Sequence, residues 1–318
     1  MNTILTKLNK YDLSDFIDTI DNHLIIYKDL LDIDSSFLFG IEIEYEKYPL
    51  VLVDKFIQEN HNDYVSRFEV DMDHGGEIIS PILNDSIKTW QELRQICIYL
   101  KNNKVTIDQN AGGHIHTNAS FLGNNVDAWK KFIILYSLYE GIIYRFTYNE
   151  RINARTYQDV TAYPIARLLY NKRNSILNSK SINGLKRYLS LDLDRYKGLN
   201  LNNVMWSQID SNKNKNTIEF RMPNGTVNHT IWQNNIYFIY RLLNTCKKDI
   251  DIERILRESN NDICYTSYNE INYQKAIELA DLIYDNDLEK RDFLKQYFKD
   301  FKVAYAERPV YSTKKLTL

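Results

Sequence analysis

The sequence predicts an α+β protein whose sheet is mostly antiparallel. Several segments alternate apolar and polar residues with the period of two that is typical of a strand, and longer helical patterns lie between and after them. The strands and helices do not follow one another in strict β–α–β order, which argues against a parallel sheet. With 318 residues, 44% of them apolar and 26% charged, the chain can bury a substantial core.

The first third of the chain is predicted to be mostly extended. Apolar residues at helical spacing predict a helix at its start. After this helix, apolar and polar residues alternate with a period of two. The expected elements are a helix over 13–31 and extended segments over 37–45, 49–58, 65–71 and 76–80. Asp85 or Ser86 then caps a helix that runs to about Asn102.

The remaining elements alternate between short strands and long helices. Strands are predicted over 104–108, 113–118, near 203–209 and over 217–222, where Pro223-Asn224-Gly225 signals a turn. Helices are predicted over 126–148, around 162–170 and over 174–189. A helical pattern extends from 228 to about 301, with breaks near 247–250, 260–270 and 285.

No Gly/Ser linker, repeat or low-complexity tract divides the chain. We expect an N-terminal helical segment over 1–36, a main domain over 37–246 and a helical extension over 247–318. The extension forms either a subdomain or part of the main domain. The boundary therefore rests on the change of pattern alone.

Charge and cysteine content exclude several classes of protein. The formal net charge of -2 gives no general basic field for nucleic acid or an acidic membrane. Cys97, Cys246 and Cys264 are odd in number and contain no CxxC, so neither a disulfide framework nor a zinc knuckle is expected. The N-terminus lacks the apolar core of a signal peptide, and the most apolar stretch, 132–144, is too short to span a bilayer. We expect a cytoplasmic protein.

Three extended segments each carry a pair of chemically active residues at i, i+2 spacing. The pairs are Glu42 with Glu44, His114 with His116, and Glu219 with Arg221. Successive side chains of a strand point to opposite faces, so each pair lies on one face about 6–7 Å apart. Carboxylates, imidazoles and a guanidinium on one sheet face can hold divalent metals and a polyphosphate. This pattern indicates an enzyme that uses ATP.

Each pair also has a structural interpretation. Glu42 and Glu44 can form the wet face of a half-exposed strand, and His114 and His116 can be hydrogen-bonded histidines beside a glycine turn. Glu219 and Arg221 can form an ion pair within one strand. The functional interpretation makes the carboxylates magnesium ligands, one imidazole a further ligand, and the arginine a fork for phosphate.

Two segments between the pairs add candidates. Glu69, Asp71, Asp73 and Glu77 are either an exposed acidic loop or metal ligands, and Glu77, which begins a strand after two glycines, is the most suggestive. Arg151 and Arg155 are either surface arginines or holders of a transferred phosphoryl group. The chain lacks a Walker A loop, a GxGxxG motif and a GxSxG elbow, so nucleotide binding must rely on metals and arginines.

The order of these motifs resembles the amidoligase family of ATP-dependent carboxylate–amine ligases. The resemblance rests on FGIEIEYE, VDMDHGGEIISP, GGHIHTN, ERINARTY, YKGLNLNNV and TIEFRMPNGTV, which extend from Phe39 to Asn244 with the helix that follows. It implies a glutamine synthetase-like fold, with a curved sheet and helices packed on one face. The domain over 37–246 would then be the catalytic domain.

The resemblance also implies roles for individual residues. Glu44 and Glu77, with Glu69 or Asp71, would hold one Mg²⁺, and Glu42, His114 and Glu219 would hold a second. His116 would lie near the nucleotide or substrate, Arg155 would help to bind the nucleotide, and Lys197 and Asn200 would lie on the substrate side. Arg151 and Arg221 would stabilise the transferred phosphoryl group.

The expected reaction is ATP-dependent formation of an amide or peptide bond through an acyl phosphate. The partners would be small-molecule or peptide carboxylates and amines, and the sequence identifies neither these substrates nor the base that deprotonates the amine. Two alternatives stay open: a metal-dependent hydrolase built on His114 and His116, and a binding or structural module that keeps the fold without turnover. Lysines and arginines between 172 and 215 are interpreted as a solvated face, not as a nucleic-acid site.

Overall fold

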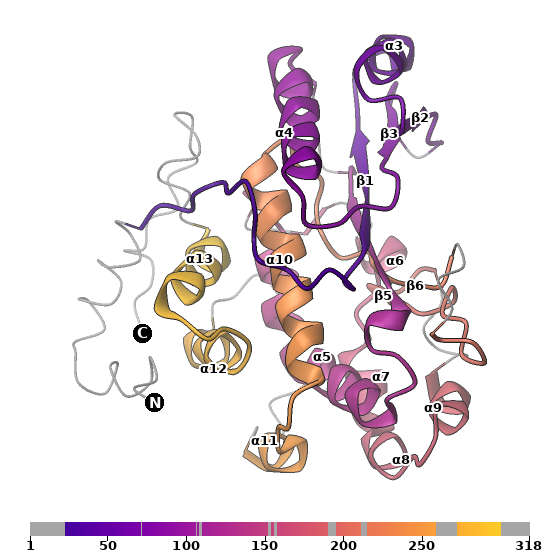
Figure 1. Cartoon of the computed structure of the whole chain (residues 1–318), viewed down its shortest axis with the longest axis vertical. Helices are drawn as coiled ribbons and strands as arrows, with labels where there is room; N and C mark the ends of the chain where they lie inside the picture. The colour runs from indigo at the N-terminus through magenta and orange to yellow at the C-terminus, as the bar shows by residue number, and fades with distance from the viewer. Residues whose placement is uncertain are drawn as a thin grey trace.

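A six-stranded, fully antiparallel sheet forms the centre of the computed structural model (Figure 1). The structure describes residues 23–70, 72–105, 107, 110–151, 154–155, 158–189, 195–210, 215–258 and 272–299. The strands lie in the order β2-β3-β1-β4-β6-β5. Their bounds are β1 Phe39–Tyr45, β2 Val65–Arg67, β3 Gly76–Ile79, β4 Gly113–Asn118, β5 Leu199–Asn200 and β6 Thr217–Phe220.

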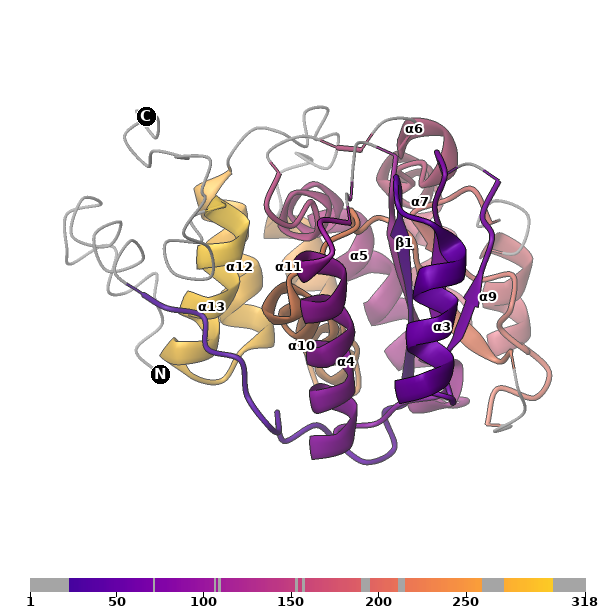
Figure 2. The ribbon, with the colours of Figure 1, turned by 90° about the horizontal axis from the view of Figure 1, so that it is seen from above.

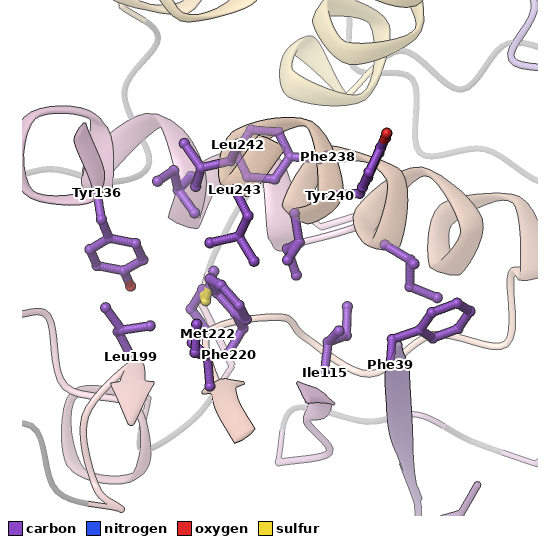
Figure 3. Packing of buried hydrophobic residues seen from close by; sticks show 14 of the residues in the cluster. Phe39, Ile115, Tyr136, Leu199, Phe220, Met222, Phe238, Tyr240, Leu242 and Leu243 are labelled. Carbon is purple, nitrogen blue, oxygen red and sulfur yellow. The ribbon is translucent and has the colours of Figure 1, made fainter. Parts of the chain in front are cut away.

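One face of the sheet is apolar and forms the floor of the core. Register places Ile43 opposite Ile78, Ile41 opposite Ile115, and Ile115 opposite Phe220, and all five side chains are buried. In the close-up view, Ile115 and Phe220 point from their strands toward the helix α10 (Figure 3). Because side chains alternate along a strand, the polar residues between these positions lie on the opposite face.

Three long helices cover the apolar face: α4 Ile87–Asn102, α5 Val126–Thr147 and α10 His229–Cys246. Trp90 of α4 stacks on Phe39 with ring centroids 5.6 Å apart, and Phe132 of α5 meets Phe220 edge-on at 6.1 Å. The helix α10 packs against both α4 and α5. The sheet is therefore covered on this side by one helical layer.

A second helical layer lies on the far side of α10 from the sheet (Figure 2). It contains α12 Tyr273–Ile283 and α13 Asp287–Phe298, which pack against α5 and α10. Phe293 of α13 stacks on Phe146 of α5, with centroids 4.9 Å apart. The C-terminal helices thus share a core with α5 and α10, and the predicted division at 246 stays a prediction.

Shorter helices connect these parts. They are α3 Leu50–Asn60, the 3₁₀ turn η1 Ala119–Phe121, α6 Gln158–Thr161, α7 Ala166–Asn171, α8 Arg173–Leu177, α9 Ile182–Leu189 and α11 Ile252–Glu258. The helices α6 to α9 lead the chain from α5 back to the edge strand β5. No helix in the described ranges combines the length and the apolar character needed to cross a membrane.

Most of the elements near the centre confirm the sequence predictions. Strands predicted over 37–45, 76–80, 113–118 and 217–222 correspond to β1, β3, β4 and β6, and the whole of β2 lies within the extended segment predicted over 65–71. Ser86 caps α4 by accepting a hydrogen bond from the backbone N–H of Thr89. The helices predicted over 126–148 and from 228 onward correspond to α5 and to α10 to α13.

The prediction of an extended segment over 49–58 is wrong. Residues 50–60 form α3, whose β-branched residues suggested a strand. Val53 and Ile57 are four residues apart and both buried, so packing of one helical face outweighs the strand preference of this segment. The backbone of Pro49 has a φ of -60° at the N-terminal cap, which suits a helix start.

Two further predictions, the strands over 104–108 and near 203–209, fail for local reasons. Lys104 has a left-handed φ of 54°, and Val105 bonds back to Leu100, so this segment ends α4 and does not begin a strand. Residues 203–209 form turns, and the strand paired with β6 is instead Leu199–Asn200.

The predicted helix over 13–31 is not observed in its described part. Residues 23–31 are not helical. Backbone N–H groups of Leu31 and Ile33 bond to the carboxylate of Asp85, and that of Lys28 bonds to Gln233. Residues 13–22, the break at 260–270 with Cys264, and the tail beyond 299 lie outside the described residues.

Candidate active site

The sheet face opposite the helices gathers polar side chains from all six strands. Antiparallel register places Glu44 opposite Glu77, Glu42 opposite His114, and His116 opposite Glu219. Asn200 on the edge strand lies opposite Glu219, and Arg67 on the other edge lies opposite Glu77. The three i, i+2 pairs of the sequence therefore come from neighbouring strands and meet on one surface.

Glu42, His116 and Glu219 form a group that could hold a metal ion. One ligand atom from each lies within 4.8 Å of the other two. Glu219 is buried, and its second oxygen accepts a hydrogen bond of 2.5 Å from the side-chain amide of Asn200. Such a fixed carboxylate beside a second carboxylate and an imidazole suits a hard divalent cation.

Glu42 is shared between the two histidines of β4. Its Oε2 lies 2.8 Å from Nδ1 of His114, and its Oε1 lies 3.1 Å from Nε2 of His116. Burial works to raise the pKa of Glu42, but these two hydrogen bonds hold it well below its usual range. For His116, burial works to lower the pKa, and the bond and charge of Glu42 outweigh it, so the pKa is raised.

A second acidic group lies beside the first. Nε2 of His114 is 3.6 Å from Oε1 of Glu44, so His114 bridges Glu42 and Glu44. The other oxygen of Glu44 accepts the backbone N–H of Gly112. Burial and the nearby charge of Glu42 raise the pKa of Glu77, although Arg67 is hydrogen-bonded to it. Glu42, Glu44 and Glu77 thus lie close together, as carboxylates that bind a divalent cation do.

Two arginines are fixed at the border of the acidic groups. Arg155 is only 4% exposed, and its guanidinium donates to the carbonyl of Pro223 at 2.5 Å and to that of Arg221 at 3.0 Å. Burial lowers the pKa of Arg155, and the charge of Glu44 opposes this effect. Arg221 donates to Glu219 at 2.5 Å and to the carbonyl of Thr161 at 3.2 Å.

A pocket of about 630 Å³ opens over this surface. Among the described residues, four carboxylates and four arginines line it: Glu42, Glu44, Glu69, Glu77, Arg67, Arg155, Arg195 and Arg221. His114, Asn110 and Tyr196 are also part of its lining. Clustered carboxylates suit divalent cations, and guanidinium groups suit phosphate oxygens. We refer to it as the charged pocket.

Some predicted site residues lie elsewhere. The guanidinium of Arg151 donates to the carbonyl of Ile107, and Arg151 is not among the residues that line the charged pocket. The ammonium of Lys197 sits 4.9 Å from the centre of the Tyr163 ring. Asp73 pairs with His74 on the surface, and Asp71 lies outside the described residues.

Sequence reasoning missed several residues of the charged pocket. Arg67 lies two residues after Val65 in the predicted extended segment. Only the pairing of β2 with β3, which places Arg67 opposite Glu77, shows that it belongs to the site. Asn110 donates to Glu46 at 3.0 Å and comes just before the glycine pair of β4. Arg195 and Tyr196 follow an irregular segment, and no pattern in the sequence distinguishes them.

Comparison with known protein families gives an independent result. Residues 51–243, more than half of the chain, match the family described as "Putative amidoligase enzyme". The chain belongs to the amidoligase family. Membership in this family points to a ligase in general terms. No curated protein and no solved structure matches the chain of this amidoligase.

Proposed function

We propose that this amidoligase is an ATP-dependent carboxylate–amine ligase that works with Mg²⁺ on a glutamine synthetase-like fold. One observation carries the proposal: Glu42, His116 and Glu219 approach one another within 4.8 Å on a sheet face that also lines a pocket with four arginines. Family membership supports amide formation, and the combination of hard metal ligands with guanidinium groups supports phosphoryl transfer.

The proposed metal ligands form two sets. Glu42, His116 and Glu219 make up one set. Glu44 and Glu77 make up the other, and Glu69 lines the same pocket. The family resemblance implies His114 as the ligand beside Glu42 and Glu219, whereas this assignment uses His116. His114 lies between Glu42 and Glu44 and can orient both carboxylates.

The arginines are assigned to the phosphates. Arg155 and Arg221 are held by main-chain carbonyls, so their guanidinium groups are oriented before a ligand arrives. Arg67 and Arg195 line the same pocket and add positive charge. Bound Mg²⁺ would supply neutralisation of the phosphate oxygens and a template for alignment.

The proposed reaction has two steps. An oxygen of the substrate carboxylate attacks the γ-phosphorus of ATP, the bond to the β-phosphate oxygen breaks, and ADP leaves. The neutral amine then attacks the acyl carbon, inorganic phosphate leaves with the bonding electron pair, and the amide nitrogen loses a proton. In both steps Arg155 and Arg221 stabilise charge on the transferred phosphoryl group.

The test is phosphate release from ATP with Mg²⁺ across a panel of carboxylates and amines, with products detected by mass. We expect turnover only when Mg²⁺ and a suitable acid are present, and we expect Glu44→Ala and Arg221→Ala to abolish it. Glu59→Ala is the matched control, because Glu59 is an exposed carboxylate of α3. Unchanged turnover in either site variant would refute the assignment.

A simpler measurement precedes this assay. ADP with Mg²⁺ should raise the unfolding temperature of the wild type, because a ligand that binds the folded state stabilises it. Tightly bound Zn²⁺ together with ATP-independent hydrolysis would instead support the alternative enzyme built on His114 and His116.

A further inference from the structure

A second pocket, also of about 630 Å³, lies on the same sheet face at the other end of β1. Its lining includes Gly40, Ser80 and Asn118, and it shares Glu42 with the charged pocket. His116 also lines it. The proposed metal group of Glu42, His116 and Glu219 therefore stands at the junction of two pockets. We refer to the second one as the apolar pocket.

The two pockets differ in charge. The charged pocket has four arginines, whereas none of the described residues lining the apolar pocket is an arginine and one, Lys215, is a lysine. The apolar side chains on the pocket side are those of Leu38, Ile79, Pro81 and Ile82. Phe39 and Ile41 also border the pocket, but their side chains are buried in the core on the other face of the sheet. A polyphosphate fits the first pocket, and an uncharged body fits the second.

Several polar groups in the walls of the apolar pocket already have partners within the protein. The amide of Asn118 accepts from the N–H of Leu38 at 2.8 Å and donates to the carbonyl of Ser36 at 3.0 Å. The hydroxyl of Ser80 accepts from Ile41 at 2.9 Å and donates to Pro81 at 2.8 Å. A ligand here meets mainly apolar surface. A nucleobase, which needs several directed hydrogen bonds, is a poorer match than an apolar chain or ring.

Gly40 is the residue that keeps the apolar pocket open. It lies within β1, opposite His116, and therefore on the same face as Glu42. A Cβ atom added at Gly40 would meet Ser80 Oγ at 3.6 Å and the Pro81 carbonyl at 3.8 Å, which are ordinary contacts. Neither close packing nor a left-handed backbone requires glycine here. The missing side chain instead leaves volume for a ligand next to the metal group.

We infer that the apolar pocket binds the body of the carboxylic acid substrate, and that this body is apolar. The inference rests on the proposed function, since it takes the phosphates to lie in the charged pocket. Attacking and leaving oxygens of phosphoryl transfer lie roughly in line, so the acid must approach from the side opposite ADP. The apolar pocket is on that side of Glu42 and His116, and the acid carboxylate reaches the junction while its body lies over Gly40.

The test measures binding and does not depend on turnover. The unfolding temperature of the full chain is followed with increasing 3-phenylpropionate, hexanoate or succinate, and separately with ADP and Mg²⁺. The variants are Gly40→Ala, Gly40→Leu and Ile82→Glu, the last on a residue that is 65% exposed at the pocket. We expect the wild type to bind the two apolar acids at least tenfold more tightly than succinate.

The variants should separate the two pockets. Gly40→Leu should weaken binding of the apolar acids at least tenfold and Gly40→Ala should have a smaller effect, while ADP with Mg²⁺ stabilises all variants as it does the wild type. Ile82→Glu should weaken the acids too, which tests the inference if Gly40→Leu does not fold.

Two results would overturn the inference. The first is that the apolar acids bind Gly40→Leu or Ile82→Glu as tightly as they bind the wild type. The second is that these variants no longer bind ADP but still bind the apolar acids. The second result would assign the apolar pocket to the nucleoside. Failure of ADP to bind the wild type would refute the proposed function, whereas selective loss of acid binding in Gly40→Leu would still support the pocket.

Discussion

Glu42 of β1 contacts its diagonal neighbour His116 of β4, with Glu42 Oε1 3.1 Å from His116 Nε2. The same two residues and Glu219 make up the candidate metal group. The hydrogen bond between this carboxylate and this imidazole is the contact that a bound metal would replace. The hydrogen-bonded arrangement thus keeps the ligand atoms close together.

The first prediction concerns Glu219. Replacing it in Glu219→Gln removes one negative charge from the group while keeping the size of the side chain. Because the charge of the ligands contributes strongly to affinity for a hard cation, we expect Mn²⁺ and Mg²⁺ to bind at least about tenfold more weakly. Paramagnetic relaxation by Mn²⁺, with displacement by Mg²⁺, measures both affinities.

Glu59→Gln provides the control for this measurement. Glu59 lies on α3, where it pairs with Lys55 and its side chain is 60% exposed. This variant should bind Mn²⁺ as the wild type does. Equal Mn²⁺ affinity in Glu219→Gln and the wild type would remove Glu219 from the metal group.

The strands that carry the site were predictable because their signals are local. Alternation with a period of two marks β1 and β4, and it places Glu42 and Glu44 on one face and His114 and His116 on one face. The same holds for the cap at Ser86, where the hydroxyl bonds within three residues. These features depend on neighbours in sequence, so no tertiary information is needed to recognise them.

The relations between strands were not predictable, because register depends on distant parts of the chain. That His116 and not His114 lies opposite Glu219 follows from the pairing of β4 with β6, about a hundred residues apart in the sequence. Likewise, Arg67 lies at the site because β2 pairs with β3. The burial of Arg155 depends on carbonyls of Arg221 and Pro223, which the sequence places far away.

The second prediction concerns Gly112, which lies between Glu44 and Arg155. A Cβ atom at this position would come within 2.9 Å of Glu44 Oε2 and 3.0 Å of Arg155 Cζ. Both neighbours are fixed by hydrogen bonds, so Gly112→Ala must displace one of them. We expect at least a tenfold loss of ATP turnover with little change in the unfolding temperature, because small displacements at an active site are costly to rate.

Gly184→Ala is the matched control for Gly112→Ala. Gly184 lies in α9, and its added methyl group would come nearest to the hydroxyl of Ser179, at 2.5 Å, which is the end of a side chain far from the charged pocket. This variant should keep wild-type turnover. If Gly112→Ala also kept wild-type turnover, the positions of Glu44 and Arg155 would be unimportant for the reaction.

The third prediction concerns a buried chain of amides that leads from α13 to the site. Gln296 donates to Asn235 at 2.6 Å, Asn235 donates to Asn149 at 2.9 Å, and Asn149 donates to the carbonyl of Asn224. The side chain of Asn224 accepts the backbone N–H of Arg155 at 3.2 Å. This chain of hydrogen bonds couples the second helical layer to the position of Arg155.

Asn235→Leu leaves the side-chain oxygen of Asn149 and an N–H of Gln296 without their partner. Each unsatisfied buried group costs about 1–3 kcal/mol, so the two groups together should lower the free energy of unfolding by about 2–6 kcal/mol. Urea unfolding measures the change. Gln58→Leu, on exposed α3, should change it by less than about 0.5 kcal/mol. A loss no larger than that of the control would show that the amide chain contributes no stability.

The fourth prediction concerns His229, at the start of α10. Burial lowers its pKa to about 4, and the positive charges of Arg94 and Lys101 act in the same direction. Its ring meets Tyr27 edge-on, with centroids 4.6 Å apart. The folded protein therefore keeps this imidazole neutral at pH values where the unfolded chain binds a proton.

The direction of the pH dependence follows from the linkage between proton binding and folding. Above the unfolded pKa of 6.5 both states are neutral and His229 adds no pH dependence. Between pH 6.5 and about 4 the unfolded state binds more protons, so the free energy of unfolding falls as pH falls. His229→Phe keeps an aromatic ring against Tyr27 and removes the titration. We expect the variant to lose less stability than the wild type over this range, measured by urea unfolding at several pH values.

A second histidine serves as an internal comparison. Burial lowers the pKa of His61, Glu92 opposes this effect, and neither ring nitrogen has a hydrogen-bond partner among the residues that the structure describes. His61→Phe should flatten the pH dependence in the same direction, and the double variant should flatten it further, because the two sites lie on different elements. If His229→Phe lost stability between pH 6.5 and 4 as steeply as the wild type, the ring would already be accessible to protons in the folded state.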